Sequence, residues 1–146
     1  RDTDRSRGLG DVYKRQALNC AGDALVIGND ALLYRLVFNL TENAIRYSRP
    51  GSTVNVSISD SDNHVLLRVK DEGPGIPKQY RESIFQPFFR LDKSRSRAYG
   101  GAGLGLALVW EIAALHGGTV EVEASSENGT TMLVSLPKRS VALTEQ

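Results

Sequence analysis

The sequence of 146 residues contains a single cysteine, Cys20, so it predicts no internal disulfide and no cysteine-based metal cluster. A lone cysteine also fits a reducing compartment. The two histidines, His64 and His116, are too few to build a zinc site by themselves. No run of about 18 apolar residues occurs, because the longest candidate, residues 104–115, is shorter and contains Glu111. What remains is a chain with 40% hydrophobic and 24% charged residues, the composition of one globular domain.

Residues 1–16 are expected to be foreign to that domain. They show no periodicity and lack the apolar core of a signal peptide, and SRGLGDVYKRQ (residues 6–16) resembles a translated sequencing adapter. A genuine basic linker is the alternative. Removing these residues takes away five of the 18 basic and three of the 17 acidic residues, which leaves 13 basic and 14 acidic residues. The remaining chain therefore has no broad positive field that would attract nucleic acid. We expect a leader at 1–16, the domain at 17–138 and a tail at 139–146.

Two segments have the periodicity of helices. In residues 31–47 apolar side chains recur every three or four positions and form one stripe. Asn29 or Asp30 is expected to cap the start of this helix, and the Arg-Pro-Gly triplet at residues 49–51 to end it. Residues 104–116 are apolar on most sides, so we expect a second, buried helix that stops at the following two glycines.

Four segments alternate between apolar and polar residues, which is typical of strands with one buried face. They are residues 53–60, 65–69, 120–124 and 132–136, and Ala124 is expected to face inward with the other apolar residues of its strand. Helices and strands fall in separate blocks rather than in βαβ repeats. The sequence therefore predicts an α+β fold, a two-layer sandwich with a mostly antiparallel or mixed sheet and helices on one face.

A polar strip flanks the apolar stripe of the first helix. Asn39, Asn43 and Arg46 fall within about 60° of one another around the helix axis. Two carboxamides four residues apart can present oxygen to a hydrated Mg²⁺, which needs few protein ligands when phosphates supply the rest. A solvated helix flank is the alternative.

Two glycine-containing segments could receive a ligand. Asp71 directly follows a strand and begins DEGPGI (residues 71–76), in which a carboxylate could accept an exocyclic amine and the glycines would admit a flat ring. A plain turn is the alternative. GAGLGL (residues 101–106) opens a helix whose N–H groups suit an anion, although a hinge is equally consistent. Neither a Rossmann nor a Walker A context surrounds it.

In this order the segments resemble the nucleotide-binding domain of bacterial sensor histidine kinases, in the superfamily that includes gyrase, the Hsp90 chaperones and MutL. The resemblance covers nearly all of residues 24–137. It implies the Bergerat or GHKL fold, with about three helices on one face of a mixed sheet. The matching motifs are NLTENAIRY (39–47), DEGPGI (71–76), IFQPFFR (84–90), GAGLGLALV (101–109) and GTT (129–131).

By the same resemblance, ATP and Mg²⁺ bind between the sheet layer and a lid. Asn43 is implied as the Mg²⁺ ligand, Asp71 as the acceptor of the adenine amine, and Arg90 as the charged contact of its motif. The implied catalytic residues are Asn39, Asn43, Arg46 and Arg90. The implied nucleotide-binding residues are Asn39, Asn43, Arg46, Tyr47, Asp71, Gly73, Gly75, Ile76, Gly101, Gly103, Leu104, Gly105, Leu106 and Thr130.

Residues near the implied lid are expected to play other roles. Phe85, Phe88, Phe89 and Trp110 are expected to pack rather than to contact nucleotide. The basic residues within 93–97 are either a solvated face or a basic lid over the triphosphate. Ala102 stands where relatives often carry a hydroxyl, so a side-chain bond to phosphate is missing there, and Thr130 could replace it only in part.

The sequence also bears on the reaction. Hydrolysing members of the superfamily carry a glutamate one turn before the Mg²⁺ asparagine, where it can activate water. Asn39 occupies that position, and an amide cannot act as a base. We therefore expect ATP to be held for transfer to a histidine on a dimerisation domain that this sequence lacks, since His116 is expected to be a helix cap.

The expected partners are ATP, the His-bearing dimerisation domain of the same kinase and, indirectly, a response regulator. We expect neither nucleic acid nor membrane contact, and a cytoplasmic location for this fragment even where the parent is anchored in the inner membrane. Two alternatives remain: a GHKL Ser/Thr kinase of the anti-sigma-factor type, and a nucleotide-binding regulatory module without catalysis.

Overall fold

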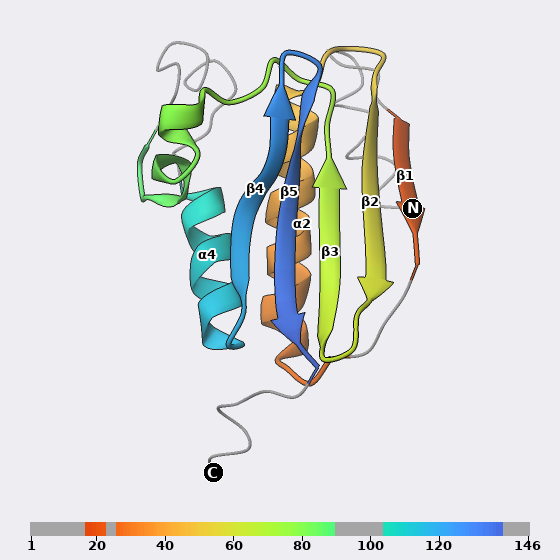
Figure 1. Ribbon diagram of the computed structural model, residues 1–146, viewed down its shortest axis with the longest axis vertical. Coiled ribbons are helices and arrows are strands. Elements are labelled where there is room, and N and C mark those ends of the chain that lie inside the picture. Colours follow the sequence, from red (N-terminus) through yellow and green to blue (C-terminus); the bar gives the residue numbers. More distant parts are fainter. Residues whose placement is uncertain (1–16, 23–25, 90–103, 139–146) are drawn as a thin grey trace.

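The computed structural model describes residues 17–22, 26–89 and 104–138. Figure 1 shows the arrangement of the elements, and its labels are used below. Those elements are, in chain order, β1 (Ala17–Ala21), α2 (Asp30–Tyr47), β2 (Thr53–Asp60), β3 (His64–Lys70), the 3₁₀ helices η1 (Lys78–Tyr80) and η2 (Ser83–Phe85), α4 (Gly105–Leu115), β4 (Thr119–Ser126) and β5 (Gly129–Pro137).

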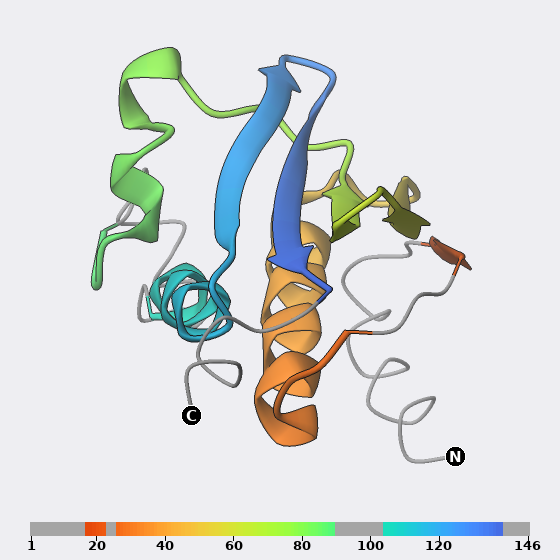
Figure 2. The same cartoon turned by 60° about the horizontal axis from the view of Figure 1, so that its bottom comes forward.

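The strands form one five-stranded sheet in the order β1-β2-β3-β5-β4. β1 is parallel to β2, and the other neighbours are antiparallel, so the sheet is mixed. Both α-helices of the described residues lie on one face of the sheet and leave the other face open (Figures 1 and 2). The expected α+β sandwich is confirmed. None of the helices in these ranges is long and apolar enough to cross a bilayer.

Helix α2 forms where the periodicity predicted it. The Asn29 side chain caps its first turn by accepting a hydrogen bond from the Leu32 N–H at 3.0 Å. The residues on its inner stripe, Leu36, Leu40 and Ala44, are buried against the sheet. This single stripe orients the helix, so its polar flank lies beside the core rather than within it.

Alternation places the inward residues of β2, β3 and β5 as expected. Eight of them are buried: Val54, Val56, Val65, Leu67, Val69, Met132, Val134 and Leu136. In β4 the prediction for Ala124 is wrong, because the register shifts between Val122 and Ala124 and leaves Ala124 exposed. An additional residue in one strand reverses the faces of those that follow it.

Helix α4 is less enclosed than its apolar sequence predicts. Val109, Ile112 and Ala113 are buried, but Trp110 is 49% exposed and Leu115 is 61% exposed. α4 packs against α2, β4 and η2 at the edge of the helical layer, and no described element covers the rest of its outer side. Trp110 does pack its ring against Phe85, with ring centroids 5.5 Å apart.

The expectation for Phe88 also needs correction. Phe88 is 69% exposed and adopts a positive φ of 67°, so unlike Phe85 and Phe89 it does not pack into the core.

Strand β1 was not predicted from the sequence. It pairs in parallel with β2, with Ala17 opposite Thr53, and its five residues are too short a run to show a clear alternation.

Candidate functional site

Segments far apart in the sequence converge at one end of the sheet on the helix side. α2 and β3 both end there, close to the turn between β4 and β5 (Figure 1). Gly73, after β3, lies so close to α2 that a Cβ there would overlap the carbonyl oxygen of Tyr47. A Cβ at Gly105 would lie 3.5 Å from Asn39 Oδ1, so the start of α4 meets the polar flank of α2. Three of the sequence motifs therefore adjoin one another.

Asp71 is the buried carboxylate of this region, with 7% of its surface exposed. Its Oδ1 accepts hydrogen bonds from the Gly73 N–H at 2.9 Å and from the Thr130 N–H at 3.2 Å. Its own N–H donates to the Thr130 carbonyl at 2.9 Å. These bonds fix the direction of the carboxylate, and a fixed direction is what an acceptor needs in order to select a hydrogen-bond donor of a ligand.

The loop after Asp71 is held against the β4–β5 turn. Gly75 has a φ of +87°, and a Cβ there would overlap the Ser126 carbonyl oxygen. The Ile76 N–H donates to Ser125 Oγ at 2.8 Å, and Ser125 Oγ is 2.8 Å from the hydroxyl of Thr130. Thr130 is buried, so its hydroxyl and its N–H both serve this local network. Its expected contact with phosphate stays a prediction.

The polar flank of α2 presents the predicted side chains half-buried. Asn39 Nδ2 donates to the Arg35 carbonyl at 2.8 Å, which leaves its Oδ1 toward α4. Asn43 makes no side-chain hydrogen bond to another described residue. Arg46 Nη2 lies 3.8 Å from Glu42 Oε1. Within the described ranges no three His, Cys, Asp or Glu residues cluster. The Asn43 side chain carries an amide oxygen, a type of ligand that Mg²⁺ accepts when phosphates supply most of its coordination, and the assignment of the metal to Asn43 stays a prediction.

Residues 28–140 match the family described as histidine kinase-, DNA gyrase B-, and HSP90-like ATPases. The chain belongs to this ATPase family. The prediction that the chain binds ATP is therefore supported by the match over residues 28–140 as well as by the separate motifs.

Relatives of the ATPase family align over most of the chain. It is 42% identical over 113 residues to the sensor-like histidine kinase SenX3 of Mycolicibacterium smegmatis, covering 77% of this chain and 29% of the relative. It is 48% identical over 106 residues to the sensor protein RstB of Escherichia coli, covering 73% and 24%. The chain thus spans less than a third of these relatives. The solved mycobacterial sensor histidine kinase MprB has 33% identity and a TM-score of 0.73, covering 95% of this chain and 91% of that one.

The start of α4 is the part of this ATPase domain that is predicted to bind phosphate. The N-cap residue, Leu104, makes no side-chain hydrogen bond to the first turn of the helix, so within the described part of the chain the first N–H groups are not capped by that side chain. Such a terminus attracts anions. Gly105 and Leu106 are half-buried and Leu104 is exposed. Arg90, Gly101 and Gly103, which were also predicted to bind, lie outside the described residues.

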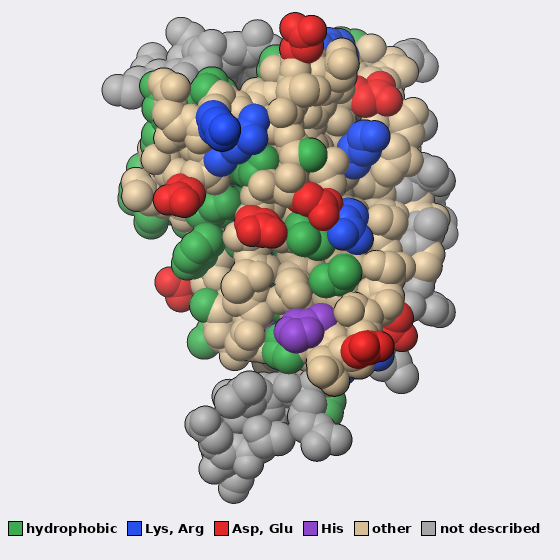
Figure 3. All heavy atoms as spheres, in the orientation of Figure 1, with side chains coloured by type: hydrophobic (Ala, Val, Ile, Leu, Met, Phe, Trp, Pro, Cys, Tyr) green, Lys and Arg blue, Asp and Glu red, His purple; other side chains and the backbone are tan. Residues whose placement is uncertain are grey.

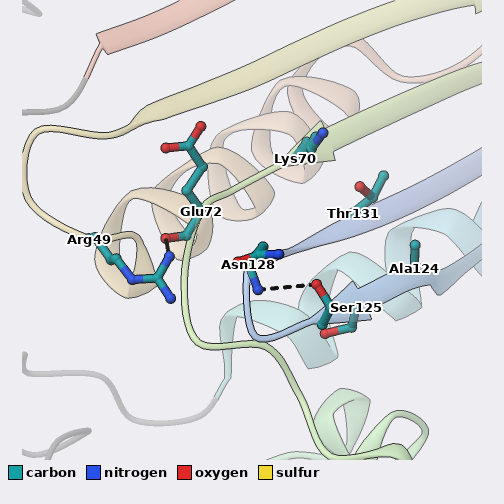
Figure 4. Close-up of a pocket in the computed structure, with 9 residues that line it drawn as sticks. Arg49, Lys70, Glu72, Ala124, Ser125, Asn128 and Thr131 are labelled. Carbon is teal, nitrogen blue, oxygen red and sulfur yellow. Dashed lines mark hydrogen bonds between the residues drawn. The ribbon is translucent and has the colours of Figure 1, made fainter.

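A hollow of about 610 Å³ lies beside this site rather than in it. It opens at the outer side of the sheet and the β4–β5 turn, and includes Lys70 and Thr131, which alternate with buried neighbours (Figure 4). None of the residues predicted to bind nucleotide lines it. Arg49 does line it. Nothing in the sequence indicated a role for Arg49, Arg81 or Ser125, because each of these side chains binds mainly backbone groups.

Proposed function

We propose that this chain is the ATP-binding catalytic domain of a two-component sensor histidine kinase. In this role it holds ATP with Mg²⁺ and presents the γ-phosphate to a histidine on a separate dimerisation domain. The observation that carries the proposal is Asp71, a buried carboxylate fixed by two backbone N–H groups near the end of α2. Full-length ShkA, 26% identical with a TM-score of 0.72, was solved in complex with AMPPNP, which supports the nucleotide part.

Each part of the ligand has a proposed partner in this chain. Asp71 accepts the adenine amine, and a guanine would place a carbonyl there instead and leave the carboxylate unmatched. Gly73 and Gly75 have no side chains to block the ring. The N-terminus of α4 receives phosphate oxygens. Asn43 offers its amide oxygen to Mg²⁺, and that ion supplies neutralisation of phosphate charge when bound.

Phosphoryl transfer requires chiefly positioning and charge neutralisation from the protein. Asn39 stands where hydrolysing relatives have a base, so the nucleotide is held without activation of water. The acceptor histidine then belongs to another domain, because His116 is buried and caps α4, with Nδ1 donating to the Ile112 carbonyl at 2.8 Å. SenX3 and RstB, named as sensor proteins, are each more than three times longer than the matched segment.

Calorimetric titration of the chain with ATP, with and without Mg²⁺, tests the proposal. We expect Mg²⁺-dependent binding of ATP, and Asn43→Ala should weaken it about 100-fold because the metal loses the amide ligand proposed here. Asn63→Ala, in the exposed β2–β3 turn, is the matched control and should bind as the unmodified chain does. Equal affinities for the two variants would remove Asn43 from the metal site.

The same titrations with GTP test the assignment of Asp71. The unmodified chain should prefer ATP to GTP, and Asp71→Asn should reduce that preference at least about tenfold because the anionic acceptor is lost. Incubation with γ-labelled ATP should leave no acid-labile label on the chain. Equal affinities of the unmodified chain for both nucleotides, or label on its own histidines, would contradict the proposal.

A further inference from the structure

Two arginines bind the two ends of the loop at residues 72–76, which follows Asp71. Arg49 Nη1 donates to the Glu72 carbonyl at 2.9 Å, and Arg81 Nε donates to the Ile76 carbonyl at 3.1 Å. Arg49 comes from the segment after α2 and Arg81 from the segment after η1. The loop is therefore held at its first and last residues by side chains from two other parts of the chain.

Each guanidinium also reaches residues 125–128, which comprise the end of β4 and the turn to β5 and are called the β4–β5 turn below. Arg49 Nη2 donates to the Glu127 carbonyl at 2.6 Å, and Arg81 Nη2 donates to the Ser125 carbonyl at 3.1 Å. Both arginines thus join one carbonyl of the 72–76 loop to one carbonyl at this turn. Figure 4 shows the Arg49 guanidinium directed at the backbone of Glu72.

The two bridged segments are the ones that orient Asp71. The loop supplies the Gly73 N–H to Asp71 Oδ1, and the strand after the turn supplies the Thr130 N–H to the same oxygen. A shift of the loop relative to the turn would change both bonds. Gly73 and Gly75 have no side chains with which to anchor the loop, so its position depends on the groups that bind its backbone N–H and carbonyl groups.

Arginine suits this task for a physical reason. Its guanidinium is planar and carries donors in a rigid fork, so it can hold two carbonyl groups at a fixed separation. Hydrogen bonds from a charged donor are shorter and stronger than neutral ones. A lysine ammonium is a single point donor and would not hold both carbonyls in one plane.

We propose that Arg49 and Arg81 are positioning residues for adenine recognition, which act by fixing the 72–76 loop to the β4–β5 turn so that Asp71 faces the base in one orientation. This inference rests on the proposed function of Asp71. It assigns the two arginines no contact with the nucleotide. Their loss is therefore expected to change which base is bound more than it changes how well the chain folds.

The test compares three substitutions in the full chain: Arg49→Ala, Arg81→Ala and the control Arg68→Ala. Arg68 also makes two side-chain hydrogen bonds, to Glu123 at 2.7 and 3.0 Å, but on the open face of the sheet, where acidic and basic side chains are interspersed (Figure 3). This pairing lowers the pKa of Glu123 and raises that of Arg68. The control Arg68→Ala thus removes a guanidinium that is hydrogen-bonded but does not contact the loop at residues 72–76.

Calorimetric affinities for ATP and GTP give the decisive ratio. We expect Arg49→Ala and Arg81→Ala each to reduce the ratio of ATP to GTP affinity about tenfold, while Arg68→Ala leaves it unchanged. Arg81→Lys should recover only part of the ratio, because one ammonium cannot hold both carbonyls. Thermal unfolding without nucleotide reports the stability of each variant, and a merely structural role would move that temperature but not the ratio.

The outcomes separate this inference from the function it rests on. ATP binding by the unmodified chain with an unchanged ratio in both arginine variants overturns the positioning role alone. Absence of ATP binding by the unmodified chain overturns the proposed function and the positioning role together. If Arg81→Ala does not fold, Arg49→Ala still decides the question, because the Arg49 side chain is exposed and its loss leaves no cavity in the core.

Discussion

Gly129 shows at the scale of a single residue how closely the strands approach the candidate site. It has a φ of +146°, and a Cβ at this position would overlap the carbonyl oxygen of Asp71 and lie 3.1 Å from the Cα of Glu72. The close approach lets the next residue, Thr130, place its N–H on the Asp71 carboxylate. The glycine is thus part of the geometry that orients Asp71.

Gly129→Ala should therefore destabilise the fold by about 3 kcal/mol, since the strained φ and the overlap with a backbone atom add together. Gly117→Ala is the matched control. Gly117 also has a positive φ, of +74°, but its nearest atom to a Cβ is Pro137 Cγ at 3.6 Å, so we expect a cost of about 1 kcal/mol from the backbone alone. Urea unfolding of both variants measures the difference, and equal costs would contradict the overlap.

At the scale of elements, one histidine joins the two helices that frame the site. His116 lies at the C-cap of α4, where its Nδ1 donates to Ile112 and its Nε2 accepts the Asn29 N–H of the α2 N-cap at 3.1 Å. Because the backbone N–H of Asn29 can only donate, Nε2 accepts and Nδ1 carries the ring proton. The end of α4 is thereby tied to the start of α2, and the first residue of α4, Gly105, meets Asn39 in the middle of α2.

His116→Ala should lower the free energy of unfolding by about 3 kcal/mol, because it removes two hydrogen bonds, strands a backbone N–H and empties a buried position. His64→Ala is the control, since His64 is exposed at the start of β3 and should cost less than about 0.5 kcal/mol. Chemical denaturation followed by circular dichroism gives both values. A similar small effect for both histidines would show that this link between the helices is dispensable.

The elements also show how far periodicity can be trusted. α2, β2, β3 and β5 formed where apolar residues recur at helical or strand spacing, because one face of each is buried against a single neighbour layer. β4 departed from its pattern at Ala124, since a register shift depends on the partner strand. The apolar sequence of α4 overstated its burial, because only its place at the edge of the layer exposes Trp110 and Leu115.

At the scale of the whole molecule, the described chain is organised around one core between the sheet and the helices. β1 is one of the two edge strands of the sheet, and residues 17–21 supply its pairing with β2. The expected division into a leader at 1–16, a domain at 17–138 and a tail at 139–146 stays a prediction. The position of β1 makes the first boundary testable.

A chain beginning at Ala17 should unfold within about 0.5 kcal/mol of the full sequence and bind ATP with the same affinity. A chain beginning at Gly22 also lacks β1 and is the comparison. It should lose about 2 kcal/mol or more, because β2 loses its parallel partner and becomes an edge. Denaturant unfolding of the three lengths distinguishes these cases. A large loss on removal of residues 1–16 alone would show that they belong to the folded domain.

The sequence by itself determined the α+β class, the helix and strand segments with one apolar face, and the order of motifs that places this chain in its ATPase family. The segments are local properties, set by side chains two to four positions apart, and each motif is likewise a short run of residues whose order can be followed along the chain. Only the tertiary structure decided which backbone groups orient Asp71, that Arg49 and Arg81 bridge to the β4–β5 turn, and that His116 reaches Asn29 across 87 positions. Each of these bonds ends on a backbone N–H or carbonyl, and almost every residue has the same two groups, so the amino-acid type of the partner carries no sign of the pairing.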